Sequence, residues 1–303
     1  MKKIKKILKL TLVVFINIIL LFLLRMITPS ENENKVESKT NTIIINKNFW
    51  GGDDNVIKGG EQIIKSIFIR FIIFLAILIL TSSLYIGVKI ILENQKSKDL
   101  NDELINNTIV ENIDDNEKNM IINWNKLNEI NNDIVAWIRI DGTNINYPIL
   151  KDNENLKYLK RAYSGEYNSN GSIFTLDENA FESKITTVYG HNMKNGLMFS
   201  QLSKYMDKKF LNEHKTFSIF TSKEEYRATI FSCYSTNVYE EEKSIRDLEF
   251  EEEIKYYKKN SKHILQSDVK IKKIVKLCTC SYLNNRSVPT TERYYIVAYL
   301  EKI

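Results

Sequence analysis

A run of apolar residues from Ile67 to Leu92 constrains the fold of this chain more than any other feature. Arg70 near its start and Lys89 near its end interrupt it, and its length of roughly twenty residues or more is enough for a helix to cross a bilayer. Apolar side chains would lie on every side of such a helix, unlike the one-sided pattern of a surface helix. We therefore expect a transmembrane helix within residues 63–92, and a buried helix of a soluble protein is the alternative.

A second apolar segment lies at the N-terminus. Several lysines precede it, and apolar residues then run from Leu10 to Leu24. This arrangement fits a signal-peptide core or a short membrane span. No Ala-x-Ala-like cleavage site follows Arg25, so we favour an uncleaved anchor over residues 1–28. Residues 29–62 are polar, and we expect them to form a linker.

The chain becomes charged after the second apolar run, and residues 93–114 are predicted to form a stalk. Met120, Trp124, Leu127 and Ile130 then recur at helical spacing. This spacing indicates an amphipathic helix, which we expect to pack on the domain that follows and not on another protein.

Beyond this helix the apolar period changes to two. Ala136, Ile138 and Ile140 alternate with other residues, and Asp141-Gly142 marks a turn. Many short strands with turn signals indicate a barrel or a sandwich. Further strand-like runs cover residues 172–176, 185–189, 216–220, 226–235, 271–279 and 294–300. Two helical interruptions are predicted, at residues 198–205 and around residues 248–257.

The three cysteines are Cys233, Cys278 and Cys280, an odd number that does not indicate a disulfide framework. Cys233 lies in an apolar run and is expected to be a buried thiol. Cys278 and Cys280 would share one face of a strand, so a strained disulfide between them stays open as an alternative. There is no second Cys/His cluster, and we predict no metal site.

Cys280 ends one apolar run, and Arg293 opens the next one thirteen residues later. A thiol becomes a strong nucleophile as a thiolate, and a nearby cation lowers its pKa. His191, which follows another apolar run, could supply that cation and protonate a leaving amine. The guanidinium of Arg293 stays charged, so its expected role is to stabilise an oxyanion or to orient the substrate backbone. Together these residues indicate nucleophilic catalysis.

These residues lie in segments that resemble the sortases. Lys276 to Cys280 is similar to the signature Thr-Leu-x-Thr-Cys, which an arginine-led strand follows, and Tyr189 to Met193 resembles the sortase histidine motif. The resemblance extends over roughly residues 115–303, with further segments in the order seen in class B sortases. These segments are Asp133 to Ile138, Asn146 to Ile149, Gly171 to Phe174, and Met198-Phe199.

The resemblance implies a mainly β fold for a catalytic domain at residues 115–303. It would be a closed sortase-type β-barrel with an N-terminal helix and a helix between late strands, and in this chain membrane helices precede it. A sortase works on the extracellular face of the cell membrane. We therefore expect the second apolar segment to run from inside to outside, and the first to lie in the interface or to insert in an unusual way.

The activity implied is that of a membrane-anchored cysteine transpeptidase of a Gram-positive cell surface. Cys280 would cleave a C-terminal sorting motif of surface proteins after a threonine, hold the protein as a thioester and pass it to an amine of the peptidoglycan precursor. His191 would act as general acid and base, and Arg293 would stabilise the oxyanion. No cofactor is expected. The modest formal charge of +5 is spread along the chain, so nucleic acid is not an expected partner.

Substrate-binding positions follow from the same resemblance. Asn155 and Leu159 match the groove segment that contacts the sorting peptide, while Tyr189, Cys278 and Thr279 match residues that flank the catalytic histidine and cysteine. For Leu159 and Tyr189, packing in the core is the alternative.

The signature is not complete, since Lys276 replaces its first threonine and Cys278 fills its variable position. Ser281 follows the cysteine where many class B members carry an acidic residue. None of these changes removes a catalytic group, so they bear on the sorting motif and on the choice of amine. Two other functions remain open: a cysteine peptidase that hydrolyses the thioester, and a non-catalytic wall-binding barrel that would tolerate Cys280→Ala.

Overall fold

The computed structural model describes residue 17 and residues 54–114, 117–153, 156–263, 265, 269–283 and 290–303. The predicted N-terminal anchor, residue 17 apart, lies outside the described residues, and so do residues 29–53 of the predicted linker. The chain divides into two compact units, Met1–Leu92 and Glu93–Ile303.

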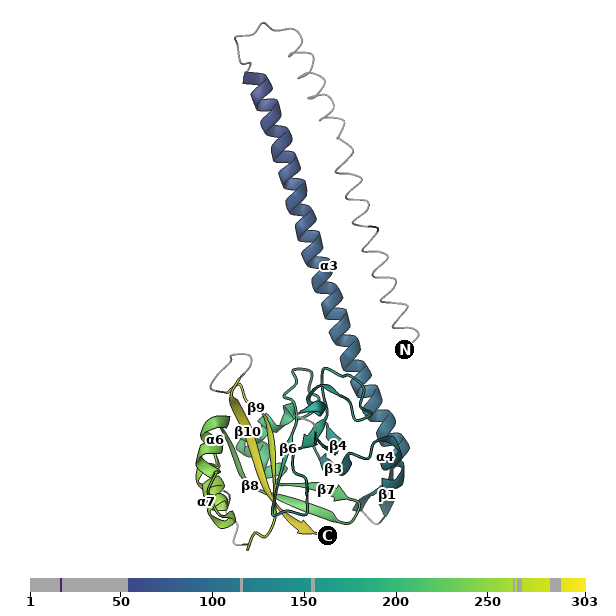
Figure 1. Ribbon diagram of the computed structural model, residues 1–303, viewed down its shortest axis with the longest axis vertical. Helices are drawn as coiled ribbons and strands as arrows, with labels where there is room; N and C mark the ends of the chain where they lie inside the picture. Colours follow the sequence, from purple (N-terminus) through teal and green to yellow (C-terminus); the bar gives the residue numbers. More distant parts are fainter. Residues whose placement is uncertain are drawn as a thin grey trace. The chain divides into compact units, whose positions relative to one another are not determined.

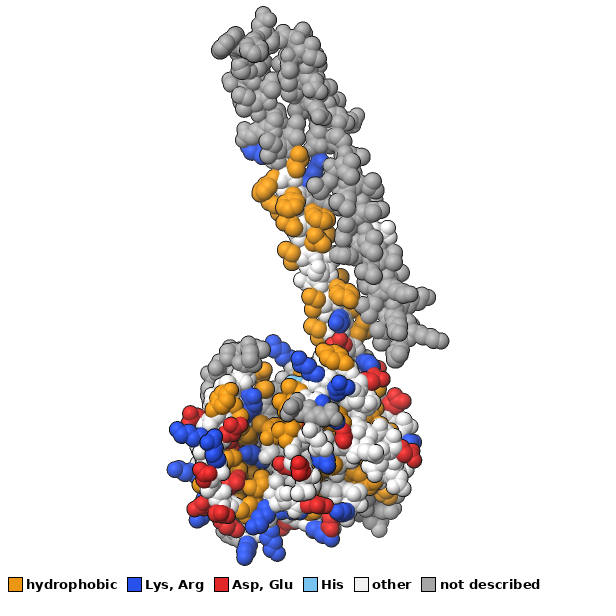
Figure 2. Space-filling model, viewed as in Figure 1, with side chains coloured by type: hydrophobic (Ala, Val, Ile, Leu, Met, Phe, Trp, Pro, Cys, Tyr) orange, Lys and Arg blue, Asp and Glu red, His pale blue; other side chains and the backbone are white. Residues whose placement is uncertain are grey.

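Helix α3 (Asp54–Thr108) contains the long apolar run. Within the described residues it is the one helix that is long and apolar enough to cross a membrane, over Lys65–Thr108. Its apolar side chains are exposed, and Ile79, Leu80 and Leu84 are 66%, 68% and 66% exposed. Figure 2 shows hydrophobic side chains along this helix. Such exposure is unfavourable in water and suits a lipid environment, so α3 fits the predicted membrane helix.

The second unit contains a closed barrel with the strand order β10-β8-β7-β3-β4-β5-β6-β9 (Figure 1), which confirms the expected fold class. Closure leaves none of these strands with an unpaired edge. The strands are β3 (Ile134–Ile140), β4 (Ile145–Lys151), β5 (Ile173–Thr175), β6 (Ile185–Tyr189), β7 (Thr216–Thr221), β8 (Glu225–Asn237), β9 (Ile274–Cys280) and β10 (Glu292–Lys302).

Two neighbouring pairs in the barrel are parallel, β4 with β5 and β6 with β9. The other six pairs are antiparallel. Because β6 and β9 run in the same direction, both end at the same edge of the barrel. β10 runs against β9 and therefore begins at that edge. The ends of β6 and β9 and the start of β10 thus converge, and the predicted catalytic residues lie at these ends or, for His191, two residues beyond one.

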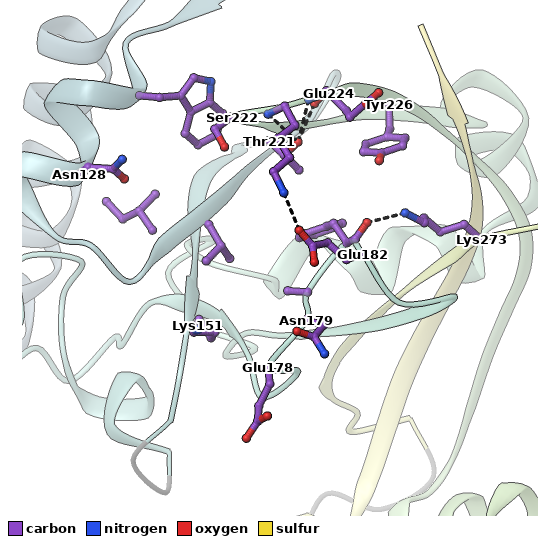
Figure 3. A pocket seen from close by; sticks show the side chains of 16 residues that line it. Asn128, Lys151, Glu178, Asn179, Glu182, Thr221, Ser222, Glu224, Tyr226 and Lys273 are labelled. Carbon is purple, nitrogen blue, oxygen red and sulfur yellow. Dashed lines mark hydrogen bonds and ion pairs between the residues drawn. The ribbon is translucent and has the colours of Figure 1, made fainter.

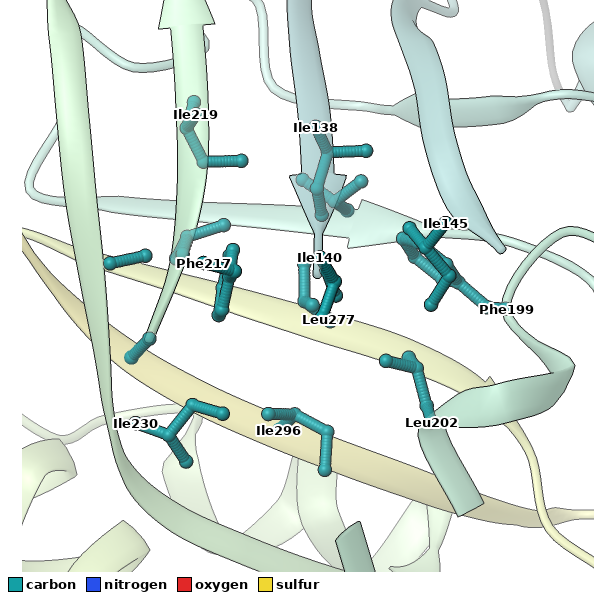
Figure 4. Close-up of a cluster of buried hydrophobic side chains, with 14 of the residues drawn as sticks. Ile138, Ile140, Ile145, Phe199, Leu202, Phe217, Ile219, Ile230, Leu277 and Ile296 are labelled. Carbon is teal, nitrogen blue, oxygen red and sulfur yellow. The ribbon is translucent and has the colours of Figure 1, made fainter. Parts of the chain in front are cut away.

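Alternating side chains of the strands fill the barrel, as period-two patterning requires. Figure 4 shows Ile138, Ile140, Leu277 and Ile296 in this interior, where each is at most 1% exposed. The opposite face of β8, β9 and β10 is also buried, because α6 (Val238–Ile245) and α7 (Phe250–Asn260) cover it (Figure 1). The helix predicted around residues 248–257 is α7, whereas α6 was not predicted.

The segment before the barrel differs from the prediction of one amphipathic helix. Strands β1 (Ile109–Asp114) and β2 (Glu117–Ile122) form an antiparallel pair, and Met120 belongs to β2. Helix α4 is confined to Trp124–Ile130, because the side chain of Asn123 accepts a hydrogen bond from the N–H of Lys126 and caps the helix there. Leu127 is fully buried on the barrel side of α4.

Shorter helices connect the strands. The helical interruption predicted at residues 198–205 is the 3₁₀ helix η2 (Ser200–Met206), and α5 (Lys208–Glu213) follows it directly. Another 3₁₀ helix, η1 (Lys157–Lys160), lies between β4 and β5.

The last turns of α3, from Glu93 to Thr108, belong to the second unit and contact the barrel. Leu104 is 1% exposed in a cluster with Trp137 and Phe220. The hydroxyl of Ser97 donates to Asn168 Oδ1 at 2.9 Å. It also accepts a hydrogen bond from the side-chain amide of Asn170 at 2.8 Å. Where the sequence predicts a stalk over 93–114, these residues continue α3 and then form β1.

Candidate active site

Cys280 and Arg293 lie directly opposite each other on β9 and β10. The N–H of Ser281 donates to the carbonyl of Glu292 at 2.8 Å, so residues 281 and 292 form a hydrogen-bonded pair. Pairs alternate along an antiparallel ladder, and Cys280 and Arg293 therefore form a non-hydrogen-bonded pair with Cα atoms about 4.5 Å apart. Both side chains are half-buried and point to the same face of the sheet. This face is the outer one, since Val275 and Leu277 point into the barrel.

The guanidinium of Arg293 is held by its own segment. Nη1 donates to the carbonyls of Thr290 at 2.7 Å and Glu292 at 2.9 Å. A guanidinium has five N–H donors in a fixed plane, so fixing Nη1 also fixes the direction of the others. Arg293 is therefore a preorganised cation on the strand position directly opposite Cys280.

His191 reaches the same edge from β6. Strand β6 pairs with β9 in parallel, Tyr189 lies opposite Cys278, and the N–H of Gly190 donates to the Cys278 carbonyl at 3.2 Å. The imidazole Nε2 lies 2.8 Å from the backbone oxygen of Leu159. A carbonyl oxygen can only accept, so Nε2 carries the proton, and in a neutral ring Nδ1 is the basic nitrogen.

Gly190, directly before the histidine, has a packing reason to be glycine. A Cβ at this position would lie 2.5 Å from Ile173 Cδ1 and 2.8 Å from the ring of Phe199. Both neighbours belong to the fully packed barrel interior. The chain can therefore leave β6 and present His191 only if residue 190 has no side chain.

Cys278 lies on the same face as Cys280, but it is 4% exposed. Burial raises the pKa of its thiol to about 12. All three cysteines are free. Residues i and i+2 of a strand are about 6–7 Å apart along the chain, whereas a disulfide needs Cβ atoms about 3.5–4.5 Å apart. The strand as it stands therefore does not favour the Cys278–Cys280 disulfide that the sequence left open.

The other predicted substrate-binding residues occupy different environments. Tyr189 is half-buried, stacks on Phe174 with ring centroids 5.7 Å apart, and has its pKa raised by burial. Leu159 is half-buried and contributes its carbonyl to His191. Thr279 is 2% exposed, and among the described residues its hydroxyl has no hydrogen-bond partner. Asn155 lies outside the described residues.

One further residue near the site is Asn192, which belongs to the histidine motif Tyr189 to Met193 but has no role predicted from the sequence. Its side-chain amide donates to the carbonyl of Cys280 at 2.7 Å. No periodicity or charge pattern signals such a contact, because it joins residues far apart in the sequence. In the part of the chain that the structure describes, no group of three or more His, Cys, Asp or Glu side chains could hold a metal ion.

A cavity of about 440 Å³ lies elsewhere in the domain (Figure 3). Lys273, just before β9, lines it, so it is at the end of the barrel opposite Cys280. Its charges are mixed, and Glu182 pairs with Lys223 at 2.7 Å. None of Cys280, His191 and Arg293 lines this cavity, which separates it from the candidate active site.

The chain is similar to known proteins in sequence and in fold. A family model described as the sortase domain matches residues 138–301. Sortase B of Listeria monocytogenes is 39% identical over 162 residues, which cover 51% of this chain and 65% of that protein. Sortase B of Staphylococcus aureus is 27% identical over 241 residues, or 77% of this chain and 98% of that protein.

The fold comparison gives the same result. The structure of the Staphylococcus aureus sortase B-substrate complex matches with a TM-score of 0.52 and 30% identity, over 60% of this chain and 85% of that chain. The match to the family model includes Cys280, His191 and Arg293. The chain belongs to the sortase family of cysteine transpeptidases, and its relatives are class B sortases.

Proposed function

We propose that this protein is a membrane-anchored transpeptidase that cleaves a C-terminal sorting motif of surface proteins after a threonine. It then joins each cleaved protein to an amine of the peptidoglycan precursor. The observation that carries the proposal is the pairing of Cys280 with Arg293 at the barrel edge where β6 delivers His191. A nucleophile, a fixed cation and an imidazole at one edge are the groups that acyl transfer through a thioester requires.

In the first half-reaction the Sγ of Cys280 attacks the threonine carbonyl carbon and forms a tetrahedral intermediate. Arg293 stabilises the negative oxygen, since its guanidinium is already oriented by two backbone carbonyls. His191 donates a proton to the nitrogen of the leaving peptide, and the C–N bond breaks. The products are a thioester on Cys280 and a free amine.

In the second half-reaction an amine of the peptidoglycan precursor attacks the thioester carbonyl. His191, now neutral, accepts a proton from this amine, and the thiolate of Cys280 leaves as the new amide forms. The Nε2 to Leu159 contact keeps the ring in one orientation through both steps. Arg293 again meets the oxyanion of the tetrahedral intermediate.

Of the proposed substrate-binding residues, Leu159 and Tyr189 have the most accessible side chains. The side chains of Cys278 and Thr279 are buried. We therefore propose that they shape the strand beneath the peptide. Asn155 keeps the role of a groove residue that the class B resemblance gives it. The solved substrate complex of the staphylococcal relative supports a substrate-binding site in this fold.

Helix α3 would anchor the enzyme, with the catalytic domain on the extracellular face of the cell membrane, where surface proteins and the precursor amine meet. The apolar, exposed side chains of α3 support the anchor. The orientation follows from the reaction, because both substrates are outside the cell.

Intact-mass measurement tests the function directly. The full chain in detergent is incubated with a panel of sorting-motif peptides, and the protein is then mixed with a candidate amine. We expect an acyl adduct that passes to the amine and that Cys280→Ala abolishes, while the matched variant Cys233→Ala, which changes a buried thiol inside the barrel, keeps it. Release to water alone would identify a peptidase. A folded, reduced enzyme that forms no adduct with any peptide contradicts the proposal.

A further inference from the structure

The ladder between β6 and β9 ends in an unusual way. The last backbone rung is the N–H of Gly190 to the carbonyl of Cys278. In a parallel pair the rungs recur every second residue, so the next donor would be the N–H of residue 192 and the next acceptor the carbonyl of Cys280. The acceptor is the expected one, but the donor is the side chain of Asn192, whose Nδ2 lies 2.7 Å from the Cys280 oxygen. The side chain therefore completes the ladder in place of the backbone.

The backbone itself has turned away at this point. The carbonyl of His191 accepts a hydrogen bond from the N–H of Phe199 at 2.9 Å, and Asn192 forms a bridge with Met198. This turn frees His191 from the plane of the sheet. Without the amide of Asn192, the segment that carries the histidine would have no hydrogen bond to the residue that carries the thiol.

The Cys280 carbonyl is one end of a peptide that is held on both sides. Because Cys280 and Arg293 are a non-hydrogen-bonded pair, this carbonyl points away from β10. Asn192 holds it on the β6 side, while the N–H of Ser281 donates to Glu292 on the β10 side. The peptide unit is planar, so two such bonds fix its rotation and with it the direction in which the Cys280 side chain leaves the backbone.

We propose that Asn192 is a positioning residue for the transpeptidase reaction. Its amide ties the segment of His191 to the backbone of Cys280, and it thereby sets the separation between the imidazole and the thiol. This inference rests on the proposed function. An asparagine suits the task because its amide donates to a carbonyl, whereas an aspartate of the same shape would place a carboxylate oxygen against that carbonyl.

The test uses the full chain in detergent and measures the rate of acyl-enzyme formation in a single turnover, over a range of sorting-peptide concentrations. The variants are Asn192→Ala and Asn192→Asp. The matched control is Asn195→Ala, which removes an exposed side chain of the same turn that caps the N–H of Leu197. Thermal unfolding of every variant is recorded alongside.

We expect both Asn192 variants to lower the limiting acylation rate by about 100-fold, the loss that a misplacement of about 1 Å can cause. The peptide concentration at half-saturation should stay within a factor of about two, because no peptide-binding group is removed. Both Asn192 variants should stay folded and unfold only about 2–4 °C below the wild type, since one hydrogen bond is lost, and Asn195→Ala should acylate at the wild-type rate.

Two results would overturn the inference, and they differ from each other. If the wild type acylates and Asn192→Asp does so at the same rate, or loses only peptide affinity, Asn192 does not position the reacting groups. If the wild type itself forms no adduct, the proposed function fails and the inference fails with it.

Discussion

Lys276 and Glu241 form an ion pair in which the two side chains are only 7% and 2% exposed, with 3.5 Å between Nζ and Oε1. The hydroxyls of Tyr234 and Tyr256 also donate to the two oxygens of Glu241. The ammonium of Lys276 lies over the rings of Tyr257 and Tyr295. The pair thus joins α6 to β9 four residues before Cys280. It explains how a lysine can replace the first threonine of the sortase signature.

Removing one partner of this pair should strongly destabilise the domain. Glu241→Gln leaves a buried ammonium without its counter-charge, for which we expect a loss of about 3–5 kcal/mol in the free energy of unfolding. Adding Lys276→Met to that variant should restore much of the loss, because the double variant no longer buries the ammonium that lost Glu241. Denaturant unfolding of the two single variants and the double variant measures the coupling.

The exposed pair Glu182–Lys223, with side chains 63% and 73% exposed, provides the control. The same change there, Glu182→Gln, should leave stability almost unchanged, since solvent screens exposed charges. Additive effects of Glu241→Gln and Lys276→Met would show that the buried pair is not coupled.

The three thiols should differ in reactivity because they differ in burial. Burial raises the pKa of both Cys278 and Cys233 to about 12, so at pH 8 roughly one molecule in ten thousand would carry either thiolate. Brief alkylation of the native protein at pH 8 should therefore add one label, at Cys280, while the unfolded chain takes three. The Cys280→Ala variant should take none under native conditions, as counted by mass spectrometry.

The raised pKa values of Cys233 and Cys278 also make the free energy of unfolding depend on pH. A thiol whose pKa is higher in the folded protein favours folding below its unfolded pKa, and this advantage is lost as the pH rises through the folded value. Stability should thus fall between about pH 9 and pH 12.

Native labelling of two or three thiols at pH 8, at the rate seen for Cys280, would contradict the burial of Cys233 and Cys278.

Strands β9 and β10, which lie at the candidate site, were predictable because their residue types are those that favour β-strands. β9 and β10 are rich in β-branched and aromatic residues, and their ends were predicted to within three residues. Helix α6 was missed for a physical reason. Its fully buried residue is Glu241, which is paired with Lys276, whereas apolar periodicity detects a helix only when the buried residues are apolar.

In the candidate site, too, some residues could be predicted from the sequence and others could not. Cys280, His191 and Arg293 could be proposed from residue type, position at strand ends and motif. The contacts of Asn192 and of the Leu159 carbonyl could not, since a hydrogen bond to backbone places no constraint on residue type at the accepting position. The same holds for residues 93–108, where a few buried side chains among many charged ones gave no clear period.

Gly171 should be needed for the orientation of His191. Its φ is +62°, and a Cβ there would lie 2.5 Å from the Leu159 oxygen that accepts the histidine Nε2 hydrogen bond. Gly171→Ala should therefore move this carbonyl and lower the single-turnover acylation rate by at least about 10-fold, in line with the cost of a displaced catalytic group.

Gly165→Ala is a matched control for this substitution. Gly165 also has a positive φ, +82°, but a Cβ there would meet no atom within 4 Å. Both variants carry the strain of a left-handed alanine, about 1 kcal/mol, and only Gly171→Ala adds the clash. Equal acylation rates for the two variants would show that the Leu159 carbonyl does not govern His191.

The last turns of α3 should be part of the folded catalytic domain. Leu104 is 1% exposed, so Leu104→Ala should cost about 2–5 kcal/mol in the free energy of unfolding. Asn106→Ala, two residues further on at an exposed position, should cost almost nothing. A fragment that begins at Glu93 should accordingly unfold at a clearly higher temperature than one that begins at Ile109, because only the longer fragment keeps Leu104 and the Ser97 hydrogen bonds to Asn168 and Asn170. Equal unfolding temperatures, measured by circular dichroism, would show that residues 93–108 do not stabilise the domain and form a stalk, as the sequence predicts.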